Sequence, residues 1–195
     1  MNILDSRLLR THIDVTTGRV DGVTPVLRRL SDLGGVFADT AAYESLLAVE
    51  DPVIYSVSTV EVARGARQLA YGLGVLYPGR VGREFYLTRG HFHAEREAAE
   101  FYFGLSGQGA LLLEDEATGE SILHALLPGD AVYVPGRTAH RTINTGVRPL
   151  VYLGVYPADA GHDYGALAQR NFAKVLVDCD GQPALLDRRA FLTSR

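Results

Sequence analysis

Short apolar runs separated by turn residues fill the chain from about residue 52 onward. Many of these runs alternate apolar with polar positions and are rich in β-branched and aromatic residues, which is typical of half-buried strands. The pattern predicts strands over residues 53–57, 69–77, 84–93, 100–105, 109–114, 121–127, 130–134, 140–144, 150–156 and 172–177. Strands at this spacing, with Gly and Pro turns and no helices between them, favour an all-β antiparallel sandwich or barrel.

Helical spacing is confined to the first third of the chain. Residues 24–33 are predicted to form a helix, because Pro25 suits a first helical position and Leu30 and Leu33 share one face. A second short helix is predicted over residues 40–48, where the apolar side chains again lie on one face.

The chain length favours a single domain. With 195 residues, we expect an N-terminal arm over residues 1–50, whose short helices pack on a barrel with a C-terminal extension over residues 51–195. The apolar and charged fractions, 47% and 22%, are those of an ordinary globular protein and exclude a disordered or fibrous chain.

Charge and cysteine usage exclude several classes of partner. The formal net charge is −4 and the basic residues are dispersed, so we expect no nucleic-acid partner. No stretch has the uninterrupted apolar character of a signal peptide or membrane span, so we expect a cytoplasmic protein without a membrane partner. The single cysteine, Cys179, excludes a disulfide framework and is expected to be a small apolar filler.

Histidines and a carboxylate follow the spacing of a metal site. His91 and His93 are two residues apart, which places both rings on the same face of a strand. Glu100 begins a later predicted strand, and His140 follows a Pro-Gly turn. Three neutral nitrogen donors and one carboxylate suit a divalent transition metal that keeps open positions.

This spacing resembles the cupin superfamily, small antiparallel barrels with a His-x-His…Glu…His metal set. A second cupin-like motif consists of Gly129, Pro135, His140 and Asn144, although Gly136 follows Pro135 one residue earlier than in many cupins.

Two glutamates compete for the carboxylate position of this motif. Glu97 has the usual spacing from His93, whereas Glu100 has the usual spacing from the closing glycine, Gly107. Glu97 falls in an alanine-rich, charged segment that is typical of a surface loop. Glu100 is therefore the predicted ligand, because strand geometry holds a ligand better than a loop does.

Several longer motifs closely resemble the cupin-type glucose-6-phosphate isomerases. They are residues 88–93 (TRGHFH), the long spacer before Glu100 and, most specifically, residues 156–165 (YPADAGHDYG). The similarity covers most of residues 25–177. It implies a homodimeric, metal-dependent enzyme of glycolysis and gluconeogenesis that interconverts glucose 6-phosphate and fructose 6-phosphate.

The resemblance also assigns roles to individual residues. It implies catalytic roles for Glu100, Tyr102 and His162, with Glu100 carrying a proton through a cis-enediol. A direct hydride shift without a base stays open, because a bound metal lowers the basicity of its carboxylate ligand. The resemblance also implies that Tyr156 contacts the substrate and that Thr88 and Gly90 contact its phosphate.

The metal and one feature of the phosphate site are less well determined by the sequence. We expect one ion per subunit, iron(II) first, with zinc, manganese or nickel as alternatives. Gly74 stands where the family would place a threonine that helps to bind phosphate, and Arg83 or Arg89 is a candidate to compensate. Tyr152 is in phase with the inward-facing tyrosines, and we expect it to pack in the core.

Two other functions use the same metal motif. One is a different metal-dependent cupin enzyme, such as a mannose-6-phosphate isomerase or a dioxygenase. The other is a non-catalytic sugar-binding cupin. The run at residues 156–165 and the long spacer favour the isomerase over both.

Overall fold

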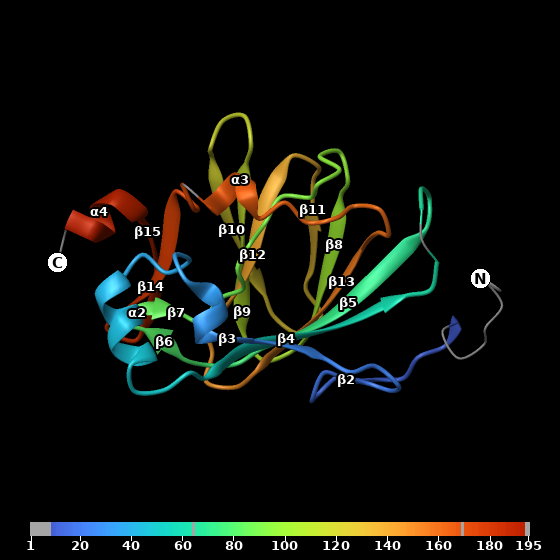
Figure 1. The fold of residues 1–195 in the computed structure, drawn as a ribbon, viewed down its shortest axis with the longest axis horizontal. Helices are drawn as coiled ribbons and strands as arrows, with labels where there is room; N and C mark the ends of the chain where they lie inside the picture. Colours follow the sequence, from blue (N-terminus) through green and yellow to red (C-terminus); the bar gives the residue numbers. More distant parts are fainter. Residues whose placement is uncertain (1–8, 64, 169, 194–195) are drawn as a thin grey trace.

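The computed structural model describes residues 9–63, 65–168 and 170–193, which form a mostly antiparallel β structure (Figure 1). The largest sheet has six strands in the order β11-β8-β13-β5-β4-β3. These strands are β3 (Val26–Arg29), β4 (Val53–Glu61), β5 (Leu69–Leu76), β8 (Glu100–Ser106), β11 (Ala131–Val134) and β13 (Leu150–Pro157). The strand pairings within it are antiparallel, so the prediction of an all-β cupin-type fold is confirmed.

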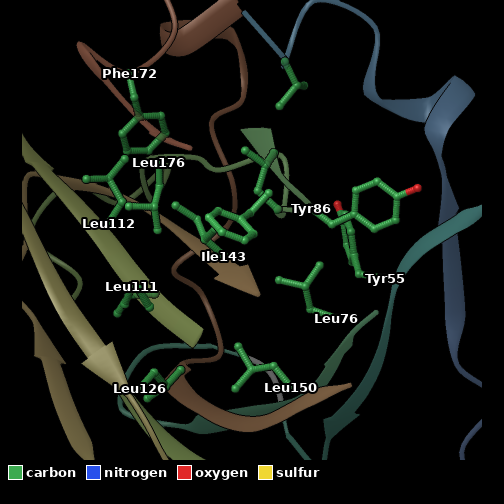
Figure 2. Close-up of a cluster of buried hydrophobic side chains, with 14 of the residues drawn as sticks. Tyr55, Leu76, Tyr86, Leu111, Leu112, Leu126, Ile143, Leu150, Phe172 and Leu176 are labelled. Carbon is green, nitrogen blue, oxygen red and sulfur yellow. The ribbon is translucent and has the colours of Figure 1, made fainter. Parts of the chain in front are cut away.

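A three-stranded sheet, in the order β10-β9-β12, contributes to the same core. It consists of β9 (Gly109–Asp115), β10 (Ser121–Leu126) and β12 (Thr138–Asn144). β9 is apolar and buried along almost its whole length because it is the middle strand. Leu111 and Ile143 from this sheet join Leu76 and Leu150 from the six-stranded sheet in one cluster of buried side chains (Figure 2).

A third sheet lies beside the barrel, in the order β15-β14-β7-β6 (Figure 1). It consists of β6 (Arg80–Val81), β7 (Glu84–Phe85), β14 (Lys174–Cys179) and β15 (Gln182–Asp187). β15 was not predicted, because Pro183 and the short apolar run around it give a weak strand pattern. Cys179 is half-buried against a small apolar cluster, as expected for a filler, and its Sγ lies 2.8 Å from an Arg83 nitrogen.

The predicted helix over residues 24–33 is wrong. Residues 26–29 form β3, which pairs with β4, and only η1 (Leu30–Leu33) is helical, as a 3-10 turn. The hydrogen bonds that residues 26–29 form with β4 outweigh their helical spacing. Leu30 and Leu33 do not need a longer helix, since the single 3-10 turn already buries both side chains in the core. β3 thereby joins the main sheet as an edge strand, although it lies in the segment expected to be an arm.

The second helix prediction is confirmed as α2 (Thr40–Leu47), which begins where the Asp39 carboxylate accepts a hydrogen bond from the Ala42 amide at 2.8 Å. Two further short helices, α3 (Gly165–Ala168) and α4 (Arg188–Thr193), lie near the C-terminus. None of the helices in the described part of the chain has the length and apolarity needed to cross a membrane.

The predicted strand over residues 84–93 is largely wrong. Only β7 is regular strand, and the rest contacts its neighbours through isolated bridges such as Leu87 with Ile143 and His91 with His140. Gly90 interrupts the extended backbone with a φ of +74°. The remaining pair of short strands, β1 (Ile13–Asp14) and β2 (Arg19–Val20), forms a separate two-stranded sheet.

Candidate functional site

Four predicted side chains meet at one end of the barrel. The ligand atoms of His91, His93, Glu100 and His140 all lie within 4.8 Å of one another. His91 is bridged to His140 of β12, and Glu100 is the first residue of β8. All are buried except His91, which is half-buried. The structure therefore brings together the ligand set that the sequence predicts.

Glu97 lies outside this cluster. Its side chain is 69% exposed and pairs with Arg137 at 2.6 Å on the surface. The Glu100 carboxylate, by contrast, occupies space that Gly154 of β13 leaves free, since a Cβ at that position would lie 2.6 Å from Oε1. The strand geometry thus separates the two candidate carboxylates.

The hydrogen bonds of the imidazoles prepare their Nε2 atoms for a cation. His93 Nδ1 lies 2.8 Å from the Ala98 carbonyl, and His140 Nδ1 lies 3.2 Å from the Thr138 carbonyl. A carbonyl only accepts, so each Nδ1 carries the proton and each neutral ring presents an Nε2 lone pair. These Nε2 atoms lie 3.2 Å and 3.1 Å from Glu100 Oε2.

Lone pairs this close to a carboxylate require a cation, either a proton or a metal ion, between them. The Nε2 atoms of His91 and His140 are buried without a hydrogen-bond partner among the described residues. Three imidazole nitrogens and one carboxylate oxygen match the donor preference of divalent transition metals. The cluster could therefore hold a metal ion.

The pKa shifts within the cluster differ from residue to residue. Burial by itself would lower the pKa of His93, but its contacts with Glu100 and the Ala98 carbonyl outweigh burial and raise it, so a proton competes with a metal ion at this ring. Burial alone would raise the pKa of Glu100, but the adjacent His140 and His93 rings lower it to about 2. Burial, together with the neighbouring imidazoles, holds the pKa of His91 well below its usual value. At neutral pH, Glu100 is thus an anion and His91 a neutral donor.

The cluster opens into a pocket of about 240 Å³. Every substrate-contact and catalytic position expected from the sequence lines this pocket: Thr88, Gly90, Glu100, Tyr102, Tyr156 and His162. The predicted metal ligand His91 lines it as well. The His162 ring centroid lies 4.3 Å from that of His91. The segment that contains His162 therefore lies beside the cluster of His91, His93, Glu100 and His140.

Two tyrosines flank the cluster. Tyr102 of β8 is buried on the same face of the strand as Glu100, and its ring centroid is 5.7 Å from that of His140. Burial, and then the negative charge of Glu100, raise the pKa of Tyr102 well above its usual value, so its phenol stays protonated. Tyr156 of β13 is half-buried, and its ring centroid lies 6.3 Å from that of His162.

The segment before His91 presents donors to the other side of the pocket. Thr88 Oγ1 accepts a hydrogen bond from the Thr142 amide at 3.0 Å, which leaves the hydroxyl proton of Thr88 available to a ligand. Gly90 is required here by its positive φ and by space, since a Cβ would lie 2.7 Å from the Phe172 ring. The backbone of Gly90 is therefore packed closely against Phe172 on one side, and Gly90 also lines the pocket.

Of the two arginines considered for compensation at the phosphate, Arg89 lines the pocket, whereas Arg83 binds the Asp178 carbonyl and Cys179 elsewhere. Sequence reasoning missed Arg28 and Tyr55, which also line the pocket. Arg28 reaches it only because residues 26–29 form a strand, so reading them as a helix concealed this position.

Most of this chain, including the pocket residues named above, is similar in sequence to known proteins. The glucose-6-phosphate isomerase (GPI) family model matches residues 27–186. Glucose-6-phosphate isomerase from Thermococcus kodakarensis is 46% identical over 90% of this chain and 92% of its own length. The enzyme of that name from Pyrococcus horikoshii is 44% identical over 92% of this chain and 94% of its own length.

Among solved structures, Bacillus subtilis oxalate decarboxylase matches 54% of this chain and 26% of its own chain, with a TM-score of 0.45 and 23% identity. The family model spans the four clustered residues and the pocket residues named above, and each of the two relatives covers at least 90% of this chain. The chain therefore belongs to the glucose-6-phosphate isomerase family.

Proposed function

We propose that this protein is a metal-dependent glucose-6-phosphate isomerase that interconverts glucose 6-phosphate and fructose 6-phosphate in glycolysis and gluconeogenesis. The observation that carries the proposal is the cluster of three histidines and one glutamate at the edge of a pocket lined by hydroxyl and guanidinium groups. Isomerisation of a sugar phosphate uses both features, since the cluster would serve the reacting oxygens and the hydroxyl and guanidinium groups would bind the phosphate. The cytoplasmic location expected from the sequence stays a prediction.

His91, His93, Glu100 and His140 would hold the metal. When bound, a divalent cation supplies Lewis-acid stabilisation to the oxygens on C1 and C2 of the sugar. The donor set suits iron(II), zinc, manganese or nickel, and we keep iron(II) as the first expectation. Elemental analysis of the purified protein identifies the ion.

Glu100 is the proposed carrier of the proton between C1 and C2. It is buried and lies where the pocket meets the cluster, and the protonated phenol of Tyr102 is on the same face of β8. A pKa near 2 keeps Glu100 ionised and therefore ready to accept a proton, but it also makes the carboxylate a weak base. The direct hydride shift is the alternative that a Glu100 variant tests.

The remaining pocket residues bind and orient the substrate. Tyr156 and His162 lie beside one another over the cluster, where the carbons that react would be. Thr88 and the backbone of Gly90 are the proposed phosphate contacts. Arg89, which also lies over the Tyr164 ring at 5.2 Å, adds positive charge at this side of the pocket.

Removal and return of the metal test the proposed function. We expect protein treated with a chelator to lose fructose 6-phosphate isomerisation and to regain it with about one divalent ion per subunit. The measurement is glucose 6-phosphate formation, paired with elemental analysis of the same samples. Full activity in protein shown to be free of metal would exclude a metal-dependent mechanism.

We also propose that the protein is a homodimer. Among the described residues, the edge strand β3 pairs on one side only, with β4, and its Val26 and Leu27 side chains are 54% and 47% exposed. An edge strand that exposes backbone groups and apolar side chains can pair with the same edge of a second chain. Light scattering at micromolar concentration is expected to give twice the subunit mass of 21.2 kDa, and a mass equal to one subunit contradicts the dimer.

A further inference from the structure

Gly74 and Tyr152 are cross-strand partners in the pocket wall. They lie opposite one another on β5 and β13, and both line the pocket. The phenol of Tyr152 lies directly against the backbone of Gly74. A Cβ at residue 74 would be 2.2 Å from Cζ and 2.5 Å from the hydroxyl oxygen of Tyr152, so only glycine admits the phenol in this position.

The Tyr152 side chain lies near two threonines, of which Thr88 lines the pocket and Thr142 is buried. The Thr142 side chain adjoins the phenol, and the Thr142 amide donates to Thr88 Oγ1. Tyr152 itself is only 7% exposed. Burial raises the pKa of Tyr152 by more than the Thr142 side chain lowers it, so the phenol keeps its proton at neutral pH and can donate it to an acceptor in the pocket.

Tyr152 and the two threonines lie at a distance from the metal-ligand cluster that suits the length of a sugar phosphate. Thr142 is two residues beyond His140 on the same face of β12, a separation of about 7 Å along the strand. The Tyr102 ring neighbours both His140 and Tyr152, with its centroid 5.7 Å from that of His140 and 5.5 Å from that of Tyr152. A substrate whose C1 and C2 oxygens are at the cluster would extend its C6 phosphate toward Tyr152.

We propose that Tyr152, admitted to the pocket by Gly74, is a specificity-determining residue that donates its hydroxyl proton to the substrate phosphate. The proposal rests on the proposed function, since it takes a sugar phosphate as the ligand. In this proposal the phenol of Tyr152, on β13, supplies the hydroxyl group at the phosphate. A hydroxyl side chain at position 74 of β5 would otherwise supply it. Thr88, Gly90 and Tyr152 then contact one phosphate from two walls of the pocket.

A purely structural role for Tyr152 makes a different prediction. An aromatic ring that covers a cross-strand glycine stabilises a sheet through packing alone. Tyr152→Phe keeps the ring over Gly74 and removes only the hydroxyl. If Tyr152 only packs against Gly74, the Tyr152→Phe variant should bind phosphate with unchanged affinity. If its hydroxyl contacts the phosphate, this affinity should fall.

The experiment compares Tyr152→Phe with the unmodified protein by two measurements. We expect KM for fructose 6-phosphate to rise about tenfold or more, the effect of one hydrogen bond to a charged group, while kcat changes little. Titration calorimetry with inorganic phosphate on the metal-loaded protein is expected to show a matching loss of affinity. Tyr133→Phe, at a tyrosine of β11 that is 64% exposed, is the matched control and should change neither value.

A second variant tests the role of Gly74. Gly74→Ala places a carbon where the phenol lies, so the ring must move and phosphate affinity should fall as in Tyr152→Phe. Unchanged KM and phosphate affinity in Tyr152→Phe would overturn the inference, as would a fall in kcat alone. An unmodified protein that binds phosphate but does not isomerise sugar phosphates would instead overturn the proposed function.

Discussion

Replacing His140 with alanine is expected to abolish both metal retention and isomerisation, and His91→Ala is expected to do the same. Each variant leaves three ligands of the four in the cluster. Loss of a residue that only supports a ligand typically lowers metal affinity by about 10–100-fold, and removal of a ligand should exceed that range. The substrate oxygens on C1 and C2 would then lose their electrostatic stabilisation.

The measurement is elemental analysis after dialysis against a chelator, followed by the isomerase assay. His124→Ala is the matched control, because His124 is an exposed residue of β10, outside the cluster. It should keep both metal and activity. A His140→Ala protein that is free of metal yet fully active would refute the proposed metal centre.

The second large effect is expected from Glu100→Gln. The amide is a poorer ligand than a carboxylate and cannot take up the transferred proton. Loss of a proton-transfer group alone typically lowers the rate by about 10²–10⁴-fold. Glu97→Gln should be almost silent, because the Glu97–Arg137 pair is exposed and contributes little to stability.

Both variants are assayed for kcat at saturating fructose 6-phosphate and for metal content. The opposite pattern, with Glu97 essential and Glu100 dispensable, would show that Glu100 is not the ligand. A Glu100→Gln protein that keeps its metal and most of its rate would exclude proton transfer by Glu100. The hydride shift would then be the mechanism to pursue.

The sequence was most informative where the relevant interactions are local. Alternation within β8 places Glu100 and Tyr102 on the buried face and Phe101 on the exposed face, as the period of a strand requires. The histidine spacing likewise predicted a cluster that the structure brings together. Turn residues and apolar runs were enough to predict most strands of the barrel.

Tertiary structure decided the features that depend on contacts between distant segments. Helical spacing at residues 24–33 did not reveal that β4 would pair with residues 26–29, and this pairing brings Arg28 to the pocket. Alternation at residues 84–93 likewise did not reveal the turn at Gly90, where the chain must fit against Phe172. Neither contact partner is close in sequence, so periodicity contains no information about it.

The pair formed by Gly74 and Tyr152 shows the same division. Read singly, Gly74 is a missing side chain and Tyr152 is an inward-facing core residue. Only the antiparallel register of β5 and β13 places the phenol against the glycine and its hydroxyl in the pocket. Residue types and their spacing determined which chemical groups are present and which face of a strand they occupy. Strand pairing determined which of them meet, because register depends on the packing of the whole core.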